Sequence, residues 1–199
     1  MSVTATTNVE IKHLNQALSD VLLSLKGIDV LYDHQYEFLK TILANQNIFY
    51  TNSTNSGKTL PCIIYPELLK KLNAYGYNFP SRPKVLIVTP LNALQLSHIN
   101  AVKGLGLKSG SLSTKNVLGM MTSDISILFV SPETLKLPQV AKALLTHREN
   151  IVLKVVDEVH KCEYFITYFS RKKYFLVKFE SFFFTLHFQS LYCSFSFYL

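Results

Sequence analysis

The sequence predicts an α/β fold in which helices cover both faces of a parallel sheet. Four short apolar runs alternate with segments of helical spacing, and polar or acidic residues directly follow most of these runs. The runs lie at 48–50, 85–88, 125–130 and 151–156. Continuous apolar runs are typical of strands buried on both faces of a parallel sheet. Ligand-binding groups are therefore expected at the carboxyl ends of the strands.

The spacing of apolar residues predicts helices between these runs. They are expected at about 9–25, 36–45, 60–72, 92–102 and 138–145. Gly27 is expected to end the first helix, which separates an N-terminal helical segment (1–27) from a domain over 28–163. Pro66 predicts a kink or an early break in the third helix. Gly104, Gly106 and Gly110 predict an irregular stretch before the third run.

Composition and charge narrow the function only partly. The chain has 199 residues, of which 48% are hydrophobic, and a formal net charge of +7, so it can form a core and can bind a polyanion. A basic domain with no polyanionic partner has the same composition. Cys62, Cys162 and Cys193 are too far apart for a disulfide framework or a zinc site, which favours a reducing compartment. Residues 1–8 lack the features of a secretory signal, so a nuclear or cytoplasmic location is expected.

Residues 52–59, between the first run and the third helix, read Asn-Ser-Thr-Asn-Ser-Gly-Lys-Thr. This pattern predicts a phosphate-binding loop, in which Lys58 reaches the terminal phosphates and the Thr59 hydroxyl binds Mg²⁺. Asn52 and Asn55 stand where glycines are common, but asparagine readily enters the left-handed backbone region. The alternative is a polar turn before a helix. The loop residues expected to bind ATP are Thr54, Asn55, Ser56, Gly57, Lys58 and Thr59.

The last apolar run ends in two adjacent acids, Asp157 and Glu158. Adjacent carboxylates are costly at the end of a strand unless a cation or a water network is present, so they predict a magnesium site. Asp157 would hold Mg²⁺ through its water shell, and Glu158 would orient and deprotonate the water that attacks the γ-phosphate. A turn that caps a helix is the alternative. We expect the first and last strands to lie side by side, so that Lys58 and Asp157 converge on one phosphate.

Gln35 stands at the start of the second predicted helix, 23 residues before Lys58. An amide offers both a donor and an acceptor, so Gln35 can read the Hoogsteen edge of adenine. Without the loop that follows, a solvated helix residue would be the simpler interpretation.

Taken together, these motifs resemble the first motor lobe of a superfamily 2 helicase, and most closely the RecQ family, over roughly residues 20–163. Gln35 matches the adenine-reading glutamine of that family, and 52–59 matches its motif I. Thr89-Pro90-Leu91 resembles motif Ia, Ser131-Pro132-Glu133 resembles the RecQ form of motif Ib, and Asp157-Glu158-Val159-His160 resembles the DEAH form of motif II. The resemblance implies a RecA-like (P-loop NTPase) fold, ATP and Mg²⁺ as cofactors, and 3′ to 5′ translocation on DNA.

The resemblance also implies roles for individual residues. Thr89, Pro90, Ser131 and Pro132 would contact the backbone of a nucleic-acid strand, and His160 would couple that strand to the nucleotide site. The implied catalytic residues are Lys58, Asp157, Glu158 and His160. The implied partner is single-stranded or forked nucleic acid, DNA rather than RNA, with neither a membrane nor an obligate protein partner.

The composition changes abruptly in the tail over 164–199, which holds 10 of the 14 phenylalanines and 5 of the 11 tyrosines. No helical or strand period persists there, so an irregular aromatic-rich tail is expected. The tail does not resemble the family, and we expect that it is not the original continuation of the chain. Residues 181–199 lack formal charge, which leaves a membrane anchor as an alternative to an aggregation-prone segment.

The sequence therefore leaves three functions open. The first is the ATP-binding lobe of a RecQ-like helicase, truncated before motif III and the second lobe and so inefficient in turnover by itself. The second is a catalytically silent module that binds nucleotide or nucleic acid, with Asn52 and Asn55 as signs of decay. The third is a membrane-anchored P-loop protein.

Overall fold

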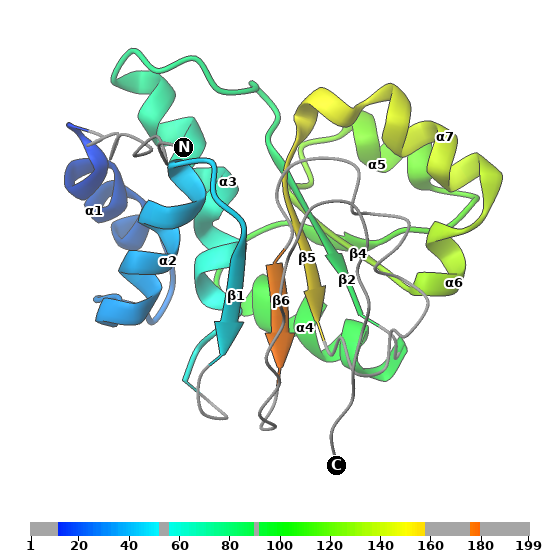
Figure 1. Cartoon of the computed structure of the whole chain (residues 1–199), viewed down its shortest axis with the longest axis horizontal. Helices are drawn as coiled ribbons and strands as arrows, with labels where there is room; N and C mark the ends of the chain where they lie inside the picture. The colour runs from blue at the N-terminus through cyan, green and yellow to red at the C-terminus, as the bar shows by residue number, and fades with distance from the viewer. Residues whose placement is uncertain (1–11, 52–55, 90–91, 158–175, 180–199) are drawn as a thin grey trace, which may run out of the picture.

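The computed structural model describes residues 12–51, 56–89, 92–157 and 176–179, and helices and strands alternate along most of these ranges (Figure 1). The strands are β1 (Ile48–Thr51), β2 (Lys84–Val88), β3 (Ser109–Ser111), β4 (Ile127–Val130), β5 (Ile151–Asp157) and β6 (Leu176–Phe179). The α-helices are α1 (Leu14–Ser24), α2 (Asp33–Leu43), α3 (Leu60–Ala74), α4 (Asn92–Gly104), α5 (Val117–Thr122), α6 (Pro132–Leu135) and α7 (Pro138–Thr146). A short 3-10 helix covers Arg148–Asn150.

The six described strands form one sheet in the order β1-β6-β5-β2-β4-β3, and every described pairing is parallel. The predicted parallel α/β sheet is therefore confirmed. The predicted first and last strands correspond to β1 and β5. The prediction that these two lie side by side is wrong, because β6 lies between them and pairs with both. The carboxyl ends of parallel strands still meet at one edge, so the chain that follows β1 and the acid that ends β5 lie at the same edge.

Strand β6 lies within the aromatic-rich tail over 164–199. The expectation that this tail is irregular is therefore wrong for Leu176–Phe179. Val177 lies opposite Phe49 of β1 and Val156 of β5 in the register of the sheet. Four residues are too few to show a period of two, and strand formation here depends on neighbours that are distant in the sequence. The other tail residues, including the candidate anchor at 181–199, lie outside the described ranges.

The central strands bury side chains on both faces, as their continuous apolar runs predict. In β2, Val85 and Ile87 belong to the core on the side of α3, whereas Leu86 and Val88 belong to the core on the side of α5 and α7. This alternation follows from the two-residue period of a strand. Figure 1 shows α1, α2 and α3 on one side of the sheet and α5, α6 and α7 on the other.

The predicted helices occur in the predicted order, with a few local differences. Helix α3 continues through Pro66 to Ala74, so the early break is not seen. The glycine-rich stretch predicted to be irregular contains β3 at Ser109–Ser111, where Gly110 is buried against Met120. Helices α5 (six residues) and α6 (four residues) have no counterpart among the predicted helices, because each is shorter than two turns and shows too little apolar spacing.

Lys84 is a charged residue at the start of a buried strand. It is 1% exposed, and its Nζ donates hydrogen bonds to the carbonyl oxygens of Ser123 and Ile125 at 2.8 and 2.7 Å. Burial is the main cause that lowers the pKa of Lys84 from 10.5 to about 8, and nearby Arg82 and Lys70 add to it. Lys84 therefore ties the turn before β4 to β2 at the cost of a buried charge.

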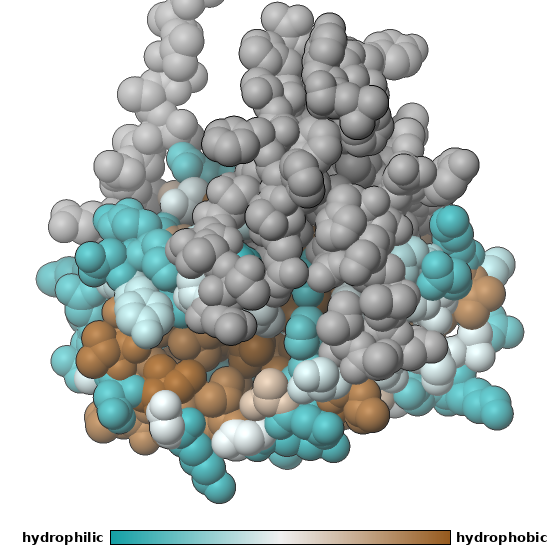
Figure 2. Space-filling model, turned by 90° about the horizontal axis from the view of Figure 1, so that it is seen from below, coloured by the Kyte–Doolittle hydropathy of each residue, from teal (hydrophilic) through white to brown (hydrophobic). Residues whose placement is uncertain are grey.

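The strands end on the face of the molecule that Figure 2 shows. Hydrophobic side chains gather on the part of this face that lies below α1 and α2 in Figure 1, where a groove is lined by residues of α1, α2 and their connection. Leu23 and Val30 in this groove are 84% and 78% exposed. Among the described helices, none combines the length and the apolar character that crossing a bilayer requires.

We predict that Val177→Pro disrupts the sheet at β6, an interior strand next to the edge strand β1. Proline cannot donate a backbone hydrogen bond, and β6 has a partner strand on both sides, so the loss cannot be relieved by solvent as it is on an edge strand. Urea unfolding should show a loss of about 3 kcal/mol or more, or no cooperative transition at all. Val177→Thr, which keeps the N–H and the β-branch, is the control. Equal stability of the two variants would show that β6 does not belong to the sheet in solution.

We predict that Lys84 makes the free energy of unfolding rise with pH above neutrality. The folded-state pKa of about 8 lies below the unfolded value of 10.5, so between these pH values the unfolded chain binds more protons. The free energy of unfolding of the wild type, relative to Lys84→Met, should therefore rise by about 2 kcal/mol between pH 7 and pH 9.5. Urea unfolding of both proteins at the two pH values measures this. A difference that does not change with pH would contradict the lowered pKa.

Candidate nucleotide-binding site

The described end of the predicted phosphate loop joins β1 to α3. Gly57 has a φ of +72°, which favours glycine, and Thr59 is the N-cap residue of α3. The Leu60 N–H donates to the Gly57 carbonyl at 3.0 Å, so the turn closes directly onto the helix. The strand, loop and helix thus follow one another in the predicted order. Thr54 and Asn55 lie outside the described residues.

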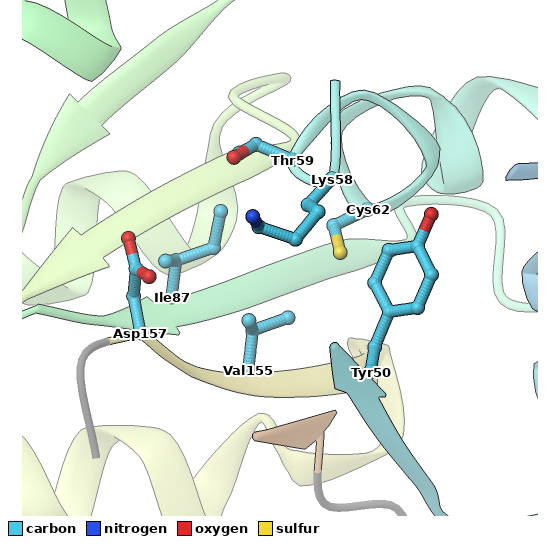
Figure 3. A pocket seen from close by; sticks show the side chains of 7 residues that line it. All are labelled: Tyr50, Lys58, Thr59, Cys62, Ile87, Val155 and Asp157. Atoms are coloured by element: carbon cyan, nitrogen blue, oxygen red, sulfur yellow. The ribbon is translucent and has the colours of Figure 1, made fainter. Parts of the chain in front are cut away.

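Three predicted site residues from distant parts of the sequence line one small cavity. Lys58 and Thr59 come from the start of α3 and Asp157 from the end of β5, and the cavity walls are completed by Tyr50, Cys62, Ile87 and Val155 (Figure 3). Figure 3 shows Lys58 extending toward Asp157. Lys58 is 4% and Asp157 is 5% exposed, so both charges are held away from bulk water.

The residues of this cavity suit a nucleotide phosphate with magnesium. A lysine ammonium complements phosphate oxygens, while a threonine hydroxyl and an aspartate carboxylate are oxygen ligands that Mg²⁺ accepts, directly or through its waters. In addition, Ser56 Oγ is buried and has no hydrogen-bond partner among the described residues. A buried hydroxyl without a partner is costly, and a bound phosphate would supply an acceptor.

The described ranges contain no group of three or more histidine, cysteine or acidic side chains that could hold a metal ion. This arrangement is compatible with magnesium, which keeps most of its waters and takes one or two protein ligands together with phosphate oxygens. Thr59 and Asp157 would be the protein ligands of such a site.

Gln35 is buried at the start of α2, and its amide is engaged within the protein. It is 1% exposed; its Oε1 accepts from the Tyr32 backbone N–H at 3.0 Å, and its Nε2 donates to the Gly57 carbonyl at 2.9 Å. The first contact caps its own helix and the second holds the phosphate loop. These two bonds leave one N–H and one acceptor lone pair of the amide, so contact with adenine stays a prediction.

His34 and Tyr50 form a contact that sequence reasoning missed. The Tyr50 hydroxyl and His34 Nδ1 are hydrogen-bonded, and the Tyr50 ring packs against Phe38 with ring centroids 4.9 Å apart. Burial raises the pKa of Tyr50 to about 12. The one signal available in the sequence was a tyrosine, rather than an aliphatic residue, two positions before the loop; buried tyrosines usually find a partner for the hydroxyl.

The residues of the predicted nucleic-acid path lie at the same edge of the sheet. Thr89 follows β2 and Ser131 follows β4, and the Thr89 N–H donates to the Val130 carbonyl at 3.0 Å. Thr89 is fully buried, however, and its hydroxyl has no partner among the described residues, so a contact with nucleic acid would require it to become exposed. Ser131 is the N-cap of α6, where its Oγ accepts from the Thr134 N–H, and Pro132 is buried in the first turn.

Three further predicted site residues cannot be located. Glu158, His160 and Pro90 lie outside the described residues, so their roles stay predictions.

Comparison with known proteins finds similarity to helicases. A family model described as DEAD/DEAH box helicase matches residues 32–174, which is most of the chain and includes Gln35, Lys58 and Asp157. The curated ATP-dependent DNA helicase Hel308 of Caldivirga maquilingensis is 28% identical over 158 residues. That match covers 77% of this chain but only 20% of the relative, so the chain spans about a fifth of that protein.

Two similar solved structures show the fold. The DUF1998 helicase MrfA bound to DNA matches with a TM-score of 0.57 and 18% identity, over 89% of this chain and 27% of that one. A nuclease-deletion mutant of the Type ISP restriction-modification enzyme LlaGI, with a DNA substrate mimic, matches with a TM-score of 0.55 and 16% identity, over 76% and 17% of the two chains. Together with the family match, these likenesses show that the sheet and its helices form a RecA-like fold.

We predict that Gly57→Ala lowers the free energy of unfolding by more than the strain of placing alanine at a positive φ accounts for. An added Cβ would lie 2.5 Å from Gln35 Nε2, so the Gln35 bond to the loop must break. Gly27→Ala is the matched control, because Gly27 has a similar φ of +74° and open space around it. Both variants should lose about 1–2 kcal/mol of unfolding free energy from strain, and Gly57→Ala about 1 kcal/mol more. Equal losses in urea unfolding would contradict the Gln35–Gly57 contact.

Proposed function

This chain belongs to the DEAD/DEAH box helicase family, and we propose that it acts as the ATP-binding motor lobe of an ATP-dependent DNA helicase. The observation that carries the proposal is the cavity shared by Lys58, Thr59 and Asp157. Lys58 and Thr59 precede α3 in the connection from β1, Asp157 ends β5, and β1 and β5 are not neighbours in the sheet. The curated relative is by name a DNA helicase, and the formal net charge of +7 suits a polyanionic partner.

In the proposed mechanism, Lys58 binds the terminal phosphates, and Thr59 and Asp157 hold Mg²⁺, directly or through water. Bound Mg²⁺ would neutralise charge that develops on the phosphate oxygens. Glu158 orients and deprotonates the attacking water, and His160 links the nucleotide site to the nucleic-acid path. Burial of Lys58 and Asp157 supports these roles, because electrostatic interactions are stronger away from bulk water.

The RecQ type is a narrower proposal within this family. It rests on Ser131-Pro132-Glu133 and on the order of the motifs, whereas the curated relative is a Hel308 helicase. A DNA substrate follows from either assignment, and 3′ to 5′ polarity is proposed from the RecQ resemblance.

One observation favours a second function, a catalytically silent nucleotide-binding module. The Gln35 side chain is 1% exposed and its amide is bonded to Tyr32 and Gly57, so a base would reach its remaining N–H and lone pair only if the side chain became exposed. This module would bind Mg·ATP without hydrolysing it in response to nucleic acid.

We predict that the full 199-residue chain binds Mg·ATP and that Lys58→Ala weakens binding about tenfold or more, because a charge-assisted contact with phosphate is lost. Calorimetric titration measures the affinity. A phosphate-release assay with single-stranded DNA and with RNA of the same sequence then separates the two functions. Stimulation by DNA that Lys58→Ala abolishes supports the helicase lobe, and binding without stimulation supports the silent module. Absence of binding by the wild type would reject both.

A further inference from the structure

The first turn of α2 contacts the chain on both sides of the phosphate loop. His34 is hydrogen-bonded to Tyr50, which lies two residues before the loop, and Gln35 donates to the Gly57 carbonyl near its end at 2.9 Å. His34 and Gln35 are consecutive residues of one helix turn. A single rigid element therefore braces both ends of the segment that connects β1 to α3.

Tyr50 connects this support to the wall of the cavity. Its hydroxyl is used for the bond to His34 and not for contact with a ligand. Tyr50 is 8% exposed, and its ring forms part of the wall that Lys58 and Asp157 also line. Figure 3 shows the hydroxyl directed away from Lys58 and Asp157. Because the pKa of Tyr50 is raised to about 12, the hydroxyl stays protonated near neutral pH and can donate to His34 Nδ1.

We propose that His34 and Tyr50 are a positioning pair that sets the affinity of the phosphate loop by fixing the end of β1 to α2. The proposal rests on the proposed function, namely that this loop binds Mg·ATP. A loop whose two ends are already held loses less conformational freedom when phosphate binds, so its affinity is higher. The Gln35 contact alone would leave the β1 end of the loop without this tie to α2.

The test compares Tyr50→Phe with Tyr36→Phe in the full chain. Tyr36 also lies on α2, but its hydroxyl donates to Asn15 Oδ1 at 2.7 Å on the side of α1, away from the cavity. Both variants lose one tyrosine hydroxyl bond and keep the ring. We expect Tyr50→Phe to weaken Mg·ADP binding about three- to tenfold in calorimetric titration and Tyr36→Phe to leave it unchanged. Magnesium tripolyphosphate, which lacks the base, should show the same loss with Tyr50→Phe.

A double-mutant cycle tests whether the two residues act together. His34→Leu should weaken binding to the same degree as Tyr50→Phe, and the double variant should be no weaker than either single variant. His34→Asn, whose side-chain amide can offer an acceptor near the position of Nδ1, should restore much of the affinity.

The outcomes separate this proposal from the proposed function. If the wild type does not bind Mg·ADP, the proposed function fails and the positioning pair fails with it. If the wild type binds and Tyr50→Phe binds equally well, only the positioning pair is rejected. Equal weakening by Tyr36→Phe, or a loss confined to Mg·ADP and absent with tripolyphosphate, would also reject it, because the effect would then come from general destabilisation or from the base.

Discussion

The common direction of the described strands is the constraint on which the rest of this structure depends. Parallel strands require a crossover between each pair, and these crossovers place helices on the faces and all carboxyl ends at one edge. Groups that follow β1, β2, β4 and β5 therefore meet there although they are far apart in the chain. Lys58 and Asp157 share a cavity for this reason, and Thr89 and Ser131 lie beside each other for the same reason.

Charge burial at this edge gives the site its chemical character. Lys58 and Asp157 are both almost fully buried, and removing two charges from water is favourable only when nearby groups compensate. The same low exposure would strengthen their interaction with phosphate and magnesium at the proposed site. Lys84, at the opposite end of β2, is also buried, but two backbone carbonyls accept hydrogen bonds from its ammonium and compensate for the lost water contacts. One buried lysine thus fits a ligand-binding role, and the other a structural role.

Helix α2 connects the base-reading and phosphate-binding parts of the proposed site. Gln35 caps its own helix and holds Gly57, so any movement of its amide toward a base also changes the support of the loop. His34 adds a second contact through Tyr50. In the proposed site, recognition of the base and support of the loop would therefore both depend on one helix turn.

The sequence by itself determined the α/β class, the loop that contains Lys58 and the acid at Asp157, because these depend on local patterns of a few residues. Tertiary structure alone decided the position of β6 between β1 and β5, since a four-residue strand acquires its hydrogen bonds from distant neighbours. It also decided that the Gln35 amide donates to Gly57 and that Tyr50 is hydrogen-bonded to His34. Hydrogen-bond partners across more than ten residues are set by how elements pack, which no local pattern specifies.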